Sequence, residues 1–426
     1  MTIALTLFAK IFSFFSQLFN FGNGSTWPGH IALKLNPNII NGILNKSRTQ
    51  TVVIIGTNGK TTTTKLLETI LRFNGKKVII NSSGANLLNG IASSLLLNSS
   101  ISGKLNTDFA IFELDENAFP QILEKIEPNY IVALNLFRDQ LDRYGEINTI
   151  AKHWKSSIQK IKKSKLILNA DDPQIAYLGK DTKLNTVYFG LNDKSLEKTV
   201  MQHASDSILC PNCEHALTFK AYYFSHLGIW ECPNCKFKKE KNIFSTFSYY
   251  PLKGTYARYD ILAAVLTAKK IGLNNTEIER GLQVFKPAFG RQEELEYNGK
   301  KIQLLLSKNP ISLNESLSTA KELGAKTIIL ILNDKIPDGL DVSWIWDVDF
   351  EQTLTKDINI IVSGLRAYDM AVRLKYAGFF VHISENIENA IKLSLVSLEE
   401  NEKLFILPNY SAMLETRKIL TGKKIL

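Results

Sequence analysis

The chain has 426 residues, more than one ordinary hydrophobic core can organise, so we expect two or three domains. Its 45% hydrophobic and 22% charged residues are typical of a soluble globular protein, and no apolar run is long enough for a membrane-spanning helix. The net charge of +10 suits a nucleic acid, a membrane face or an anionic substrate, and it does not choose among them.

The first predicted element is an apolar, aromatic helix from Leu5 to Phe21. Lys10 and Gln17 interrupt its apolar residues, as in an amphipathic helix. A signal peptide is not expected, because no basic segment precedes the run and no clear cleavage site follows it. The helix either packs on its own protein, the simpler interpretation, or docks shallowly on a membrane surface. A turn-rich linker at 22–29 follows.

The next element is a β-branched strand, Val52–Ile55, that enters a glycine turn and then a helix. Backbone N–H groups and the positive end of that helix attract a polyphosphate. Lys60 can reach the terminal phosphates and Thr61 can hold a magnesium ion. The commonest form of this motif would need glycine at position 54, where Ile54 stands. The sequence therefore predicts a chain that uses a nucleoside triphosphate, bound by Thr57, Asn58, Gly59, Lys60, Thr61 and Thr62.

Short apolar strands and helical stretches alternate from residue 51 onward, which is typical of a mostly parallel, doubly wound α/β sheet. The predicted strands after the first are 78–81, 109–113, 130–135, 165–169 and 186–189, then 302–306, 327–332, 358–363 and 404–408. Helices are predicted at 259–271 and 275–284. We divide the chain into an N-terminal helix and linker (1–45), a central ATP-binding domain (46–294) with an insertion (206–240), and a C-terminal α/β domain (295–426).

Acidic residues follow the predicted strand at 109–113. Ligands of parallel sheets meet the carboxyl ends of the strands, so Glu113 is expected to bind a magnesium ion that bridges phosphate and substrate. Asp115 and Glu116 instead fit a solvated loop. A weaker signal at the same sheet edge comes from Asp139, Asp142 and Arg143.

All four cysteines of the chain lie in two identical Cys-Pro-Asn-Cys knuckles, Cys210 with Cys213 and Cys232 with Cys235. This spacing matches a four-thiolate zinc ribbon, and a closed tetrahedral site indicates a structural metal. Two redox pairs or disulfides are the alternatives, although cytosolic chains rarely keep disulfides. No thiol remains as a nucleophile. If ammonia must be released from glutamine by a cysteine, a partner has to supply that cysteine.

Together these motifs resemble the Mur ligase superfamily, whose members join an acid to an amine with ATP. The resemblance covers residues 45–426. The segment 56–62 is similar to the family's phosphate loop, and Glu113 to its magnesium-binding glutamate. Gly290–Glu293 is similar to the arginine motif, which would place Arg291 on the phosphates. Asn169–Asp172 is also typical of the family.

Other positions match the superfamily less well. The segment 139–144 looks like its Asp-His-Leu/Met-Asp-Arg motif, with Gln140 where a metal-binding histidine usually stands. Ala257 and Asp260 replace the usual adenine-contacting asparagines, although Asp260 can still accept from an adenine amino group. Lys155 lies where many members carry a carbamylated lysine, and an ordinary surface lysine is the simpler interpretation.

Two departures narrow the resemblance to the MurT family of subunits of lipid II isoglutaminyl synthase. We expect no counterpart of the N-terminal domain that binds a uridine nucleotide in typical members, because only residues 1–45 precede the ATP-binding domain, and a zinc ribbon interrupts the core. The segment 338–347 shares the likeness, and its part 343–347 has a rare composition. The segments 27–32, 308–310 and 409–413 share it as well. The resemblance implies that an aspartate in or next to the segment 338–347 completes the glutaminase triad of a partner subunit. Asp347 is the first candidate and Asp349 the second.

The resemblance also implies the reaction: ATP-dependent amidation of the α-carboxylate of D-glutamate in the lipid II stem peptide, through an acyl phosphate, during peptidoglycan synthesis. Ammonia would come from a GatD-like class I glutaminase in a heterodimer. The implied cofactors are ATP, Mg²⁺ and structural Zn²⁺. We expect a cytoplasmic protein, peripheral at the inner face of the membrane, where positive charge and the apolar helix favour the lipid leaflet.

Two rival functions remain at this stage. One is a stand-alone Mur-type ligase that adds an amino acid, as folylpolyglutamate synthase does. The other is a basic, zinc-ribbon nucleic-acid-binding protein. Two observations argue against nucleic-acid binding. The aromatic residues of the ribbon are not interleaved with a dense basic run, and this function would leave the phosphate loop unexplained.

Overall fold

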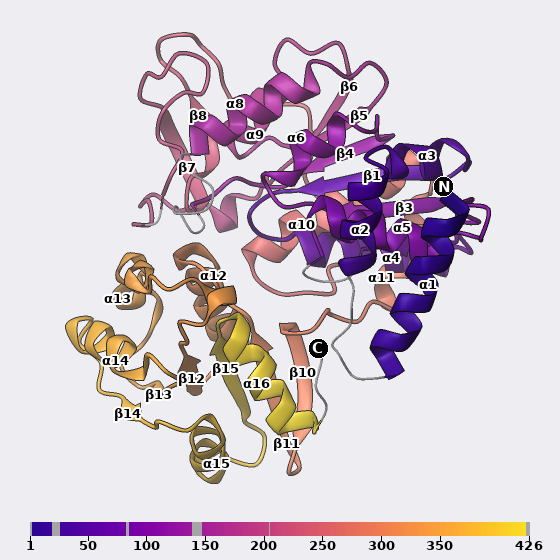
Figure 1. The fold of residues 1–426 in the computed structure, drawn as a ribbon. Coiled ribbons are helices and arrows are strands. Elements are labelled where there is room, and N and C mark those ends of the chain that lie inside the picture. Colours follow the sequence, from indigo (N-terminus) through magenta and orange to yellow (C-terminus); the bar gives the residue numbers. More distant parts are fainter. Residues whose placement is uncertain (1, 19–25, 82–84, 139–146, 204, 423–426) are drawn as a thin grey trace.

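The computed structural model describes residues 2–18, 26–81, 85–138, 147–203 and 205–422. The predicted motif at 139–144, which includes Gln140, lies outside the described residues, as does the end of the first predicted helix. The chain forms a central unit, drawn in indigo to pink in Figure 1, and a C-terminal unit, drawn in orange to yellow.

The central unit is built on a seven-stranded sheet in the order β2-β3-β1-β4-β5-β6-β9, and every described pair is parallel. The predicted doubly wound sheet is thus confirmed. Its first strand is buried from Thr51 to Ile55, as expected of a strand covered on both faces. The strands are β1 (Gln50–Ile55), β2 (Val78–Ile80), β3 (Phe109–Glu113), β4 (Tyr130–Ala133), β5 (Lys165–Asn169), β6 (Asn185–Phe189) and β9 (Ile243–Phe244).

Helices cover both faces of this sheet, and each face has its own apolar core. One core is closed by α4 (Lys60–Phe73), α10 (Thr255–Ile271) and α11 (Asn275–Gln283). The other is closed by α2 (Trp27–Leu35), α3 (Ile39–Asn45), α5 (Leu88–Asn98), α6 (Ala118–Leu123), α8 (Ile147–Ile158) and α9 (Pro173–Leu178). The N-terminal helix α1 (Thr2–Leu18) packs on α5 and α2 from outside.

The cysteine-bearing insertion forms a hairpin of β7 (Thr218–Phe224) and β8 (Leu227–Glu231). This hairpin is fused to the central unit. The Trp230 indole donates to the Ala170 carbonyl at 3.1 Å, and the Tyr223 hydroxyl donates to the Leu191 carbonyl at 3.1 Å. The insertion therefore extends the core beside the end of β5.

The C-terminal unit is a six-stranded sheet in the order β10-β11-β15-β12-β13-β14, antiparallel only between β10 and β11. The predicted strands at 302, 327, 358 and 404 correspond to β11 (Lys300–Leu305), β12 (Thr327–Ile331), β13 (Asn359–Ser363) and β15 (Lys403–Pro408). The sequence did not indicate the edge strands β10 (Arg291–Tyr297) and β14 (His382–Ile383), because the first is rich in charge and the second is very short.

Helices also cover both faces of the C-terminal sheet. They are α12 (Pro310–Glu322), α13 (Phe350–Thr353), α14 (Ala367–Tyr376), α15 (Ile387–Ser397) and α16 (Tyr410–Thr421). Short 3-10 turns lie at Lys194–Leu196, Ile336–Asp338 and Ser343–Asp347. Within the described ranges, no helix is both long enough and apolar enough to cross a bilayer.

Candidate active site

The phosphate loop joins β1 to α4 at the carboxyl edge of the central sheet. Gly59 has φ 88°, and a Cβ there would lie 2.1 Å from the Asp260 Oδ1, so backbone and packing both require glycine. The Asn135 side chain accepts from the Asn58 N–H at 2.9 Å and donates to the Asn58 carbonyl at 3.0 Å. The end of β4 therefore fixes the shape of the loop.

Lys60 lies inside the curve of this loop. Its Nζ donates to the carbonyls of Gly56 and Thr57, the latter at 3.3 Å, and lies 3.4 Å from the Glu116 carboxylate. The ammonium group and the N–H groups at the start of α4 form a positive cradle, which is the arrangement that binds polyphosphates.

Glu113 ends β3 beside Thr61. Burial raises the pKa of Glu113, while a hydrogen bond with Thr61 and the charges of Lys60, Arg291 and Lys308 oppose that rise. Its Oε2 is buried and has no hydrogen-bond partner among the described residues. A buried carboxylate oxygen beside a threonine hydroxyl is a fitting donor set for Mg²⁺.

The expectation that Asp115 and Glu116 are solvated loop acids is wrong. Both are buried. The loop after β3 turns inward, because the Trp154 indole donates to the Glu116 carbonyl at 2.9 Å and Lys60 attracts the Glu116 carboxylate. Asp115 accepts from the Asn117 N–H at 3.2 Å. Glu116 thus helps to hold Lys60.

Arg291 begins β10 and faces a narrow cavity between the central and C-terminal units. Burial places the pKa of Asp260 well above its usual value, and Arg291 opposes this shift. The Gln292 side chain donates to the Tyr256 hydroxyl at 2.8 Å, which fixes an aromatic wall. The cavity is lined on the central side by Asn58, Gly59, Thr62, Asn135, Tyr256 and Asp260, and on the other side by Arg291, Gln292, Ile311, Ser312 and Glu315.

Sequence reasoning gave no site role to two residues that the fold brings to the phosphate loop. The Asn309 amide donates to the Asn58 Oδ1 at 3.3 Å, across the boundary between the two units. The charge of Lys308 acts on Glu113. The only sequence signal for these two residues is the likeness of the segment 308–310 to the MurT family, and that likeness assigned the segment no role.

Lys155 is buried on α8, so the expectation of an ordinary surface lysine is wrong. Its Nζ donates to the carbonyls of Tyr177 and Lys180, both at 2.9 Å, and lies 3.6 Å from the Tyr177 ring centre. Burial lowers the pKa of Lys155 to about 8. These partners lie at the end of α9, where a cation stabilises the exposed carbonyls.

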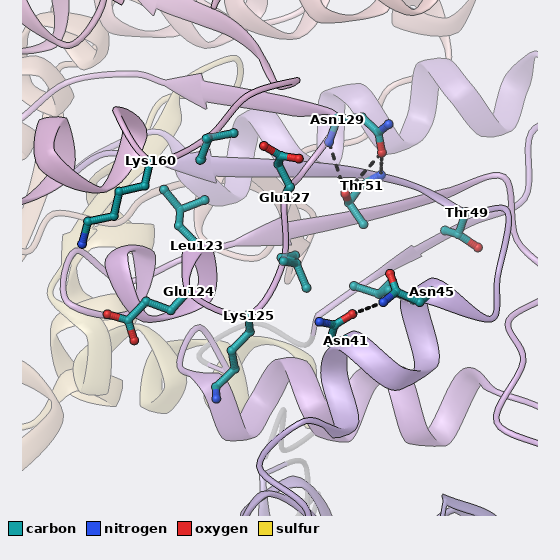
Figure 2. A pocket seen from close by; sticks show the side chains of 13 residues that line it. Asn41, Asn45, Thr49, Thr51, Leu123, Glu124, Lys125, Glu127, Asn129 and Lys160 are labelled. Carbon is teal, nitrogen blue, oxygen red and sulfur yellow. Dashed lines mark hydrogen bonds between the residues drawn. The ribbon is translucent and has the colours of Figure 1, made fainter.

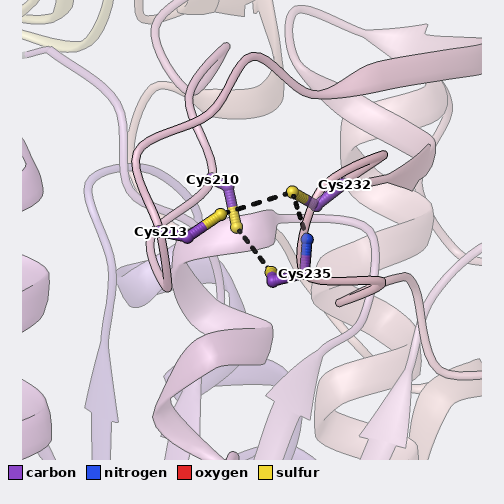
Figure 3. A group of neighbouring side chains, drawn as sticks. All are labelled: Cys210, Cys213, Cys232 and Cys235. Atoms are coloured by element: carbon purple, nitrogen blue, oxygen red, sulfur yellow. Dashed lines mark hydrogen bonds between the residues drawn. The ribbon is translucent and has the colours of Figure 1, made fainter.

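The four cysteine sulfurs lie together, with all ligand atoms within 4.8 Å of one another (Figure 3). The Sγ atoms of Cys210 and Cys235 are 3.6 Å apart, and those of Cys213 and Cys232 are 3.5 Å apart. All four cysteines are free of disulfide bonds in the structure. The His215 N–H lowers the pKa of Cys213, which favours the thiolate. The donor set and its spacing fit a tetrahedral zinc ion.

The two candidate aspartates of the C-terminal unit have different surroundings. Asp347 is exposed at the end of the turn Ser343–Asp347. Asp349 is buried, and its two carboxylate oxygens face His203 and the Asn314 amide, the latter at 2.9 Å. A partner protein can reach Asp347 without rearrangement of the chain.

A wider cavity of about 580 Å³ lies at the opposite, amino edge of the central sheet (Figure 2). Several of its polar side chains bond to one another or to nearby backbone. Asn129 accepts from the Thr51 N–H at 2.8 Å, and Asn45 donates to Asn41. Because the phosphate loop, Glu113 and Arg291 all lie elsewhere, this cavity is separate from the candidate active site.

Comparison with known sequences gives two family matches. Residues 54–222 match the family described as "Mur ligase middle domain", and residues 306–413 match "MurT ligase C-terminal". The chain is 33% identical to the Streptococcus pneumoniae protein named "Lipid II isoglutaminyl synthase (glutamine-hydrolyzing) subunit MurT", over 95% of this chain and 94% of that one. It is also 33% identical to the protein of the same name from Staphylococcus aureus, over 92% and 91%.

Solved structures share the fold. A pseudomurein peptide ligase type C from Methanothermus fervidus aligns with a TM-score of 0.65 at 23% identity, over 88% of this chain and 79% of that one. The MurF ligase from Thermotoga maritima, solved in complex with ADP, aligns with a TM-score of 0.63 at 16% identity, over 93% and 84%. At these identities the likeness establishes the α/β ligase fold alone.

Proposed function

Since the chain belongs to the MurT family of Mur-type ligases, we propose that it amidates the α-carboxylate of D-glutamate in the stem peptide of lipid II. The product is D-isoglutamine, and the process is peptidoglycan synthesis. One observation carries the proposal: Lys60, Arg291 and the unpartnered oxygen of Glu113 converge on the phosphate loop. Two cations and a metal-binding carboxylate beside a phosphate loop are the groups that phosphoryl transfer requires.

A carboxylate is a poor electrophile, so the reaction needs activation. Transfer of the γ-phosphoryl group of ATP to the substrate carboxylate gives an acyl phosphate and ADP. Ammonia attacks the acyl carbon, the tetrahedral intermediate collapses, and phosphate leaves as the amide forms. Lys60 and Arg291 neutralise the charge on the transferred group, where fixed cations contribute most. Tyr256, beside the same cavity, provides an aromatic surface for the base.

Two metals belong to this proposal. Thr61 and Glu113 would hold Mg²⁺, which supplies charge neutralisation at the phosphates. The four cysteines would hold a structural Zn²⁺. The β7–β8 hairpin packs beside β5, and its Gly228 N–H donates to the Asp171 carbonyl at 3.1 Å. Zinc would therefore stabilise the sheet edge that carries the chemistry.

Ammonium dominates over ammonia at neutral pH, so we propose that a GatD-like class I glutaminase delivers ammonia directly. The exposed carboxylate of Asp347 would orient the histidine of that partner. The surface beside it supports a protein contact, because the Trp346 and Tyr376 rings pack edge-on at 5.6 Å and both are exposed. Leu365, Tyr368 and Val372 continue this apolar surface at the start and along the exposed side of α14.

The test uses the purified chain with ATP, Mg²⁺, lipid II and a high concentration of an ammonium salt. We expect ATP hydrolysis that depends on both lipid II and ammonium, and the mass change of an acid converted to an amide. ATP hydrolysis that requires an amino acid instead would support a stand-alone amino-acid-adding ligase. A salt-sensitive complex with short duplexes and no ligase activity would support nucleic-acid binding.

A further inference from the structure

Helix α1 presents one apolar face to its own protein and a second apolar face to solvent. Leu5 and Ala9 are buried against the core, which accounts for the packing on α5 and α2. On the outer side, Ile3, Leu7, Ile11 and Phe14 are 57%, 46%, 48% and 64% exposed. Their spacing of three and four residues places them in one stripe along the helix.

The stripe continues onto a neighbouring loop. A Cβ on Gly103 would lie 2.5 Å from the Thr2 side chain, so this loop touches the start of α1. Ile101, in the same loop, is 56% exposed. Figure 1 shows α1 at the margin of the molecule, on the outside of α2 and α5. The outer apolar face consists of Ile3, Leu7, Ile11, Phe14 and Ile101.

The N-terminal part of the sequence is strongly basic. Glu68 is the only acidic residue among the first 107, which contain ten lysines and arginines. Glu68 itself is buried and paired with Lys65 and Arg72. Helices α1, α2, α3 and α5 carry no acidic residue at all. Exposed cations accompany the face, including Lys34 on α2 and Lys104 beside Ile101.

An apolar stripe beside exposed lysines, on helices that carry no acidic residue, fits an anionic lipid surface better than a protein. Each basic residue near such a surface adds electrostatic attraction, and an apolar helix face buries itself at the boundary between headgroups and acyl chains. Since no described helix can span a bilayer, the helix would lie in the plane of the membrane. A surface that binds a protein would instead be expected to carry charged groups of both signs and a shaped groove.

We propose that α1 docks in the interface of an anionic lipid leaflet, with Ile3, Leu7, Ile11 and Phe14 among the acyl chains. Exposed cations beside this face, such as Lys34 and Lys104, face the lipid phosphates. This docking deepens the proposed function, because it holds the ligase at the surface where a lipid-linked substrate resides. The binding itself requires neither ATP nor lipid II, so it can be tested apart from the reaction.

The test is co-sedimentation of the full chain with phosphatidylcholine vesicles, with and without phosphatidylglycerol. We expect binding that requires the anionic lipid and weakens with salt. The double variant Leu7→Glu/Ile11→Glu should reduce the vesicle partition coefficient at least about tenfold, since it removes two apolar side chains from the stripe and places two negative charges beside an anionic lipid surface. Val396→Glu, at an equally apolar and exposed position on α15, is the matched control and should bind like the wild type.

Activity separates this proposal from the ligase proposal. With lipid II in anionic vesicles the double variant should be slow, and with detergent-solubilised lipid II it should match the wild type, which also verifies its folding. Wild-type protein that does not bind anionic vesicles, or a variant that binds them equally well, would overturn the docking. A third result would also overturn it: the wild type forms a dimer and does not bind vesicles, and the double variant is a monomer. None of these results depends on whether amidation occurs.

Discussion

The carboxyl edge of the central sheet and the outer surface of the C-terminal unit are built in opposite ways. At the sheet edge, polar side chains are buried and interlocked, as in the pairing of Asn135 with the phosphate loop and of Lys60 with Glu116. On the C-terminal surface, large apolar groups such as Tyr376 lie exposed beside Asp347. The first arrangement is preorganised for chemistry, and the second is left open for a partner.

This contrast divides the proposed reaction into two measurable parts. Amidation driven by added ammonium should need only the central edge and the cleft beside it. Amidation driven by glutamine should need the C-terminal surface as well. A change in one region should therefore affect the two activities differently.

The largest effect is expected from Lys60→Ala. Removing the cation inside the phosphate loop should lower both ammonium-driven and glutamine-driven amidation at least about 100-fold, because its charge stabilises the transferred phosphoryl group. Initial rates of ADP release and product mass measure this. Lys65→Ala removes a half-buried lysine that lies on the same helix and is paired with Glu68; it is the control and should retain activity. A Lys60→Ala protein with the wild-type rate would break the assignment of the site.

Asp347→Asn should separate the two activities. We expect glutamine-driven amidation to fall about 100-fold or more, as when a triad loses its orienting carboxylate, while the ammonium-driven rate is unchanged. The measurement compares both rates in the complex with the glutaminase. Asp357→Asn, at another exposed position, should alter neither rate. Equal losses with both nitrogen sources would contradict the role of Asp347.

Zinc removal should affect the central edge rather than the C-terminal surface. We expect about one zinc per chain, and the variant Cys213→Ser should lower the melting temperature by about 10 °C, because metal binding contributes to folding. Elemental analysis and thermal unfolding test this. After chelation of the wild type, added zinc should restore stability and added magnesium should not. A metal-free protein of unchanged stability would remove the structural role.

Tyr376→Glu should weaken the glutaminase complex about 10-fold to 100-fold without changing ammonium-driven amidation, because a charge replaces an aromatic contact. Calorimetry or surface plasmon resonance gives the dissociation constant. Val396→Glu, another exposed apolar position of the same unit, serves as the control. If both variants bind the glutaminase like the wild type, the partner surface lies elsewhere.

The smallest effect concerns Glu315, on the inner side of the C-terminal unit. Burial raises the pKa of Glu315 from 4.5 to about 7. The folded state therefore binds the extra proton between these values, and the stability this provides is lost as pH rises through about 7. Glu315→Gln should match the wild type near pH 4.5 and be about 1–3 kcal/mol more stable at pH 8. Denaturant unfolding at both pH values measures this, and a pH-independent difference would contradict it.

The sequence predicted the elements well where the signal is local. The strand, glycine turn and helix around Lys60, the alternation of apolar strands and the two cysteine knuckles all follow from short-range spacing. The strand β10 gave no such signal, because it pairs on one side only and most of its residues are charged. Lys155 looked like a surface lysine, because nothing in its local sequence shows that the end of α9 covers it.

By itself the sequence determined the fold class, the family and the chemical identity of the phosphate loop and the cysteine cluster, since these depend on residues close together in the chain. Only the tertiary structure decided that Glu116 holds Lys60, that Asn309 reaches Asn58, and that α1 exposes a second apolar face. Such contacts join residues far apart in sequence. They depend on how helices and strands pack against one another and on which charged groups are buried away from water. No local sequence pattern encodes either of these.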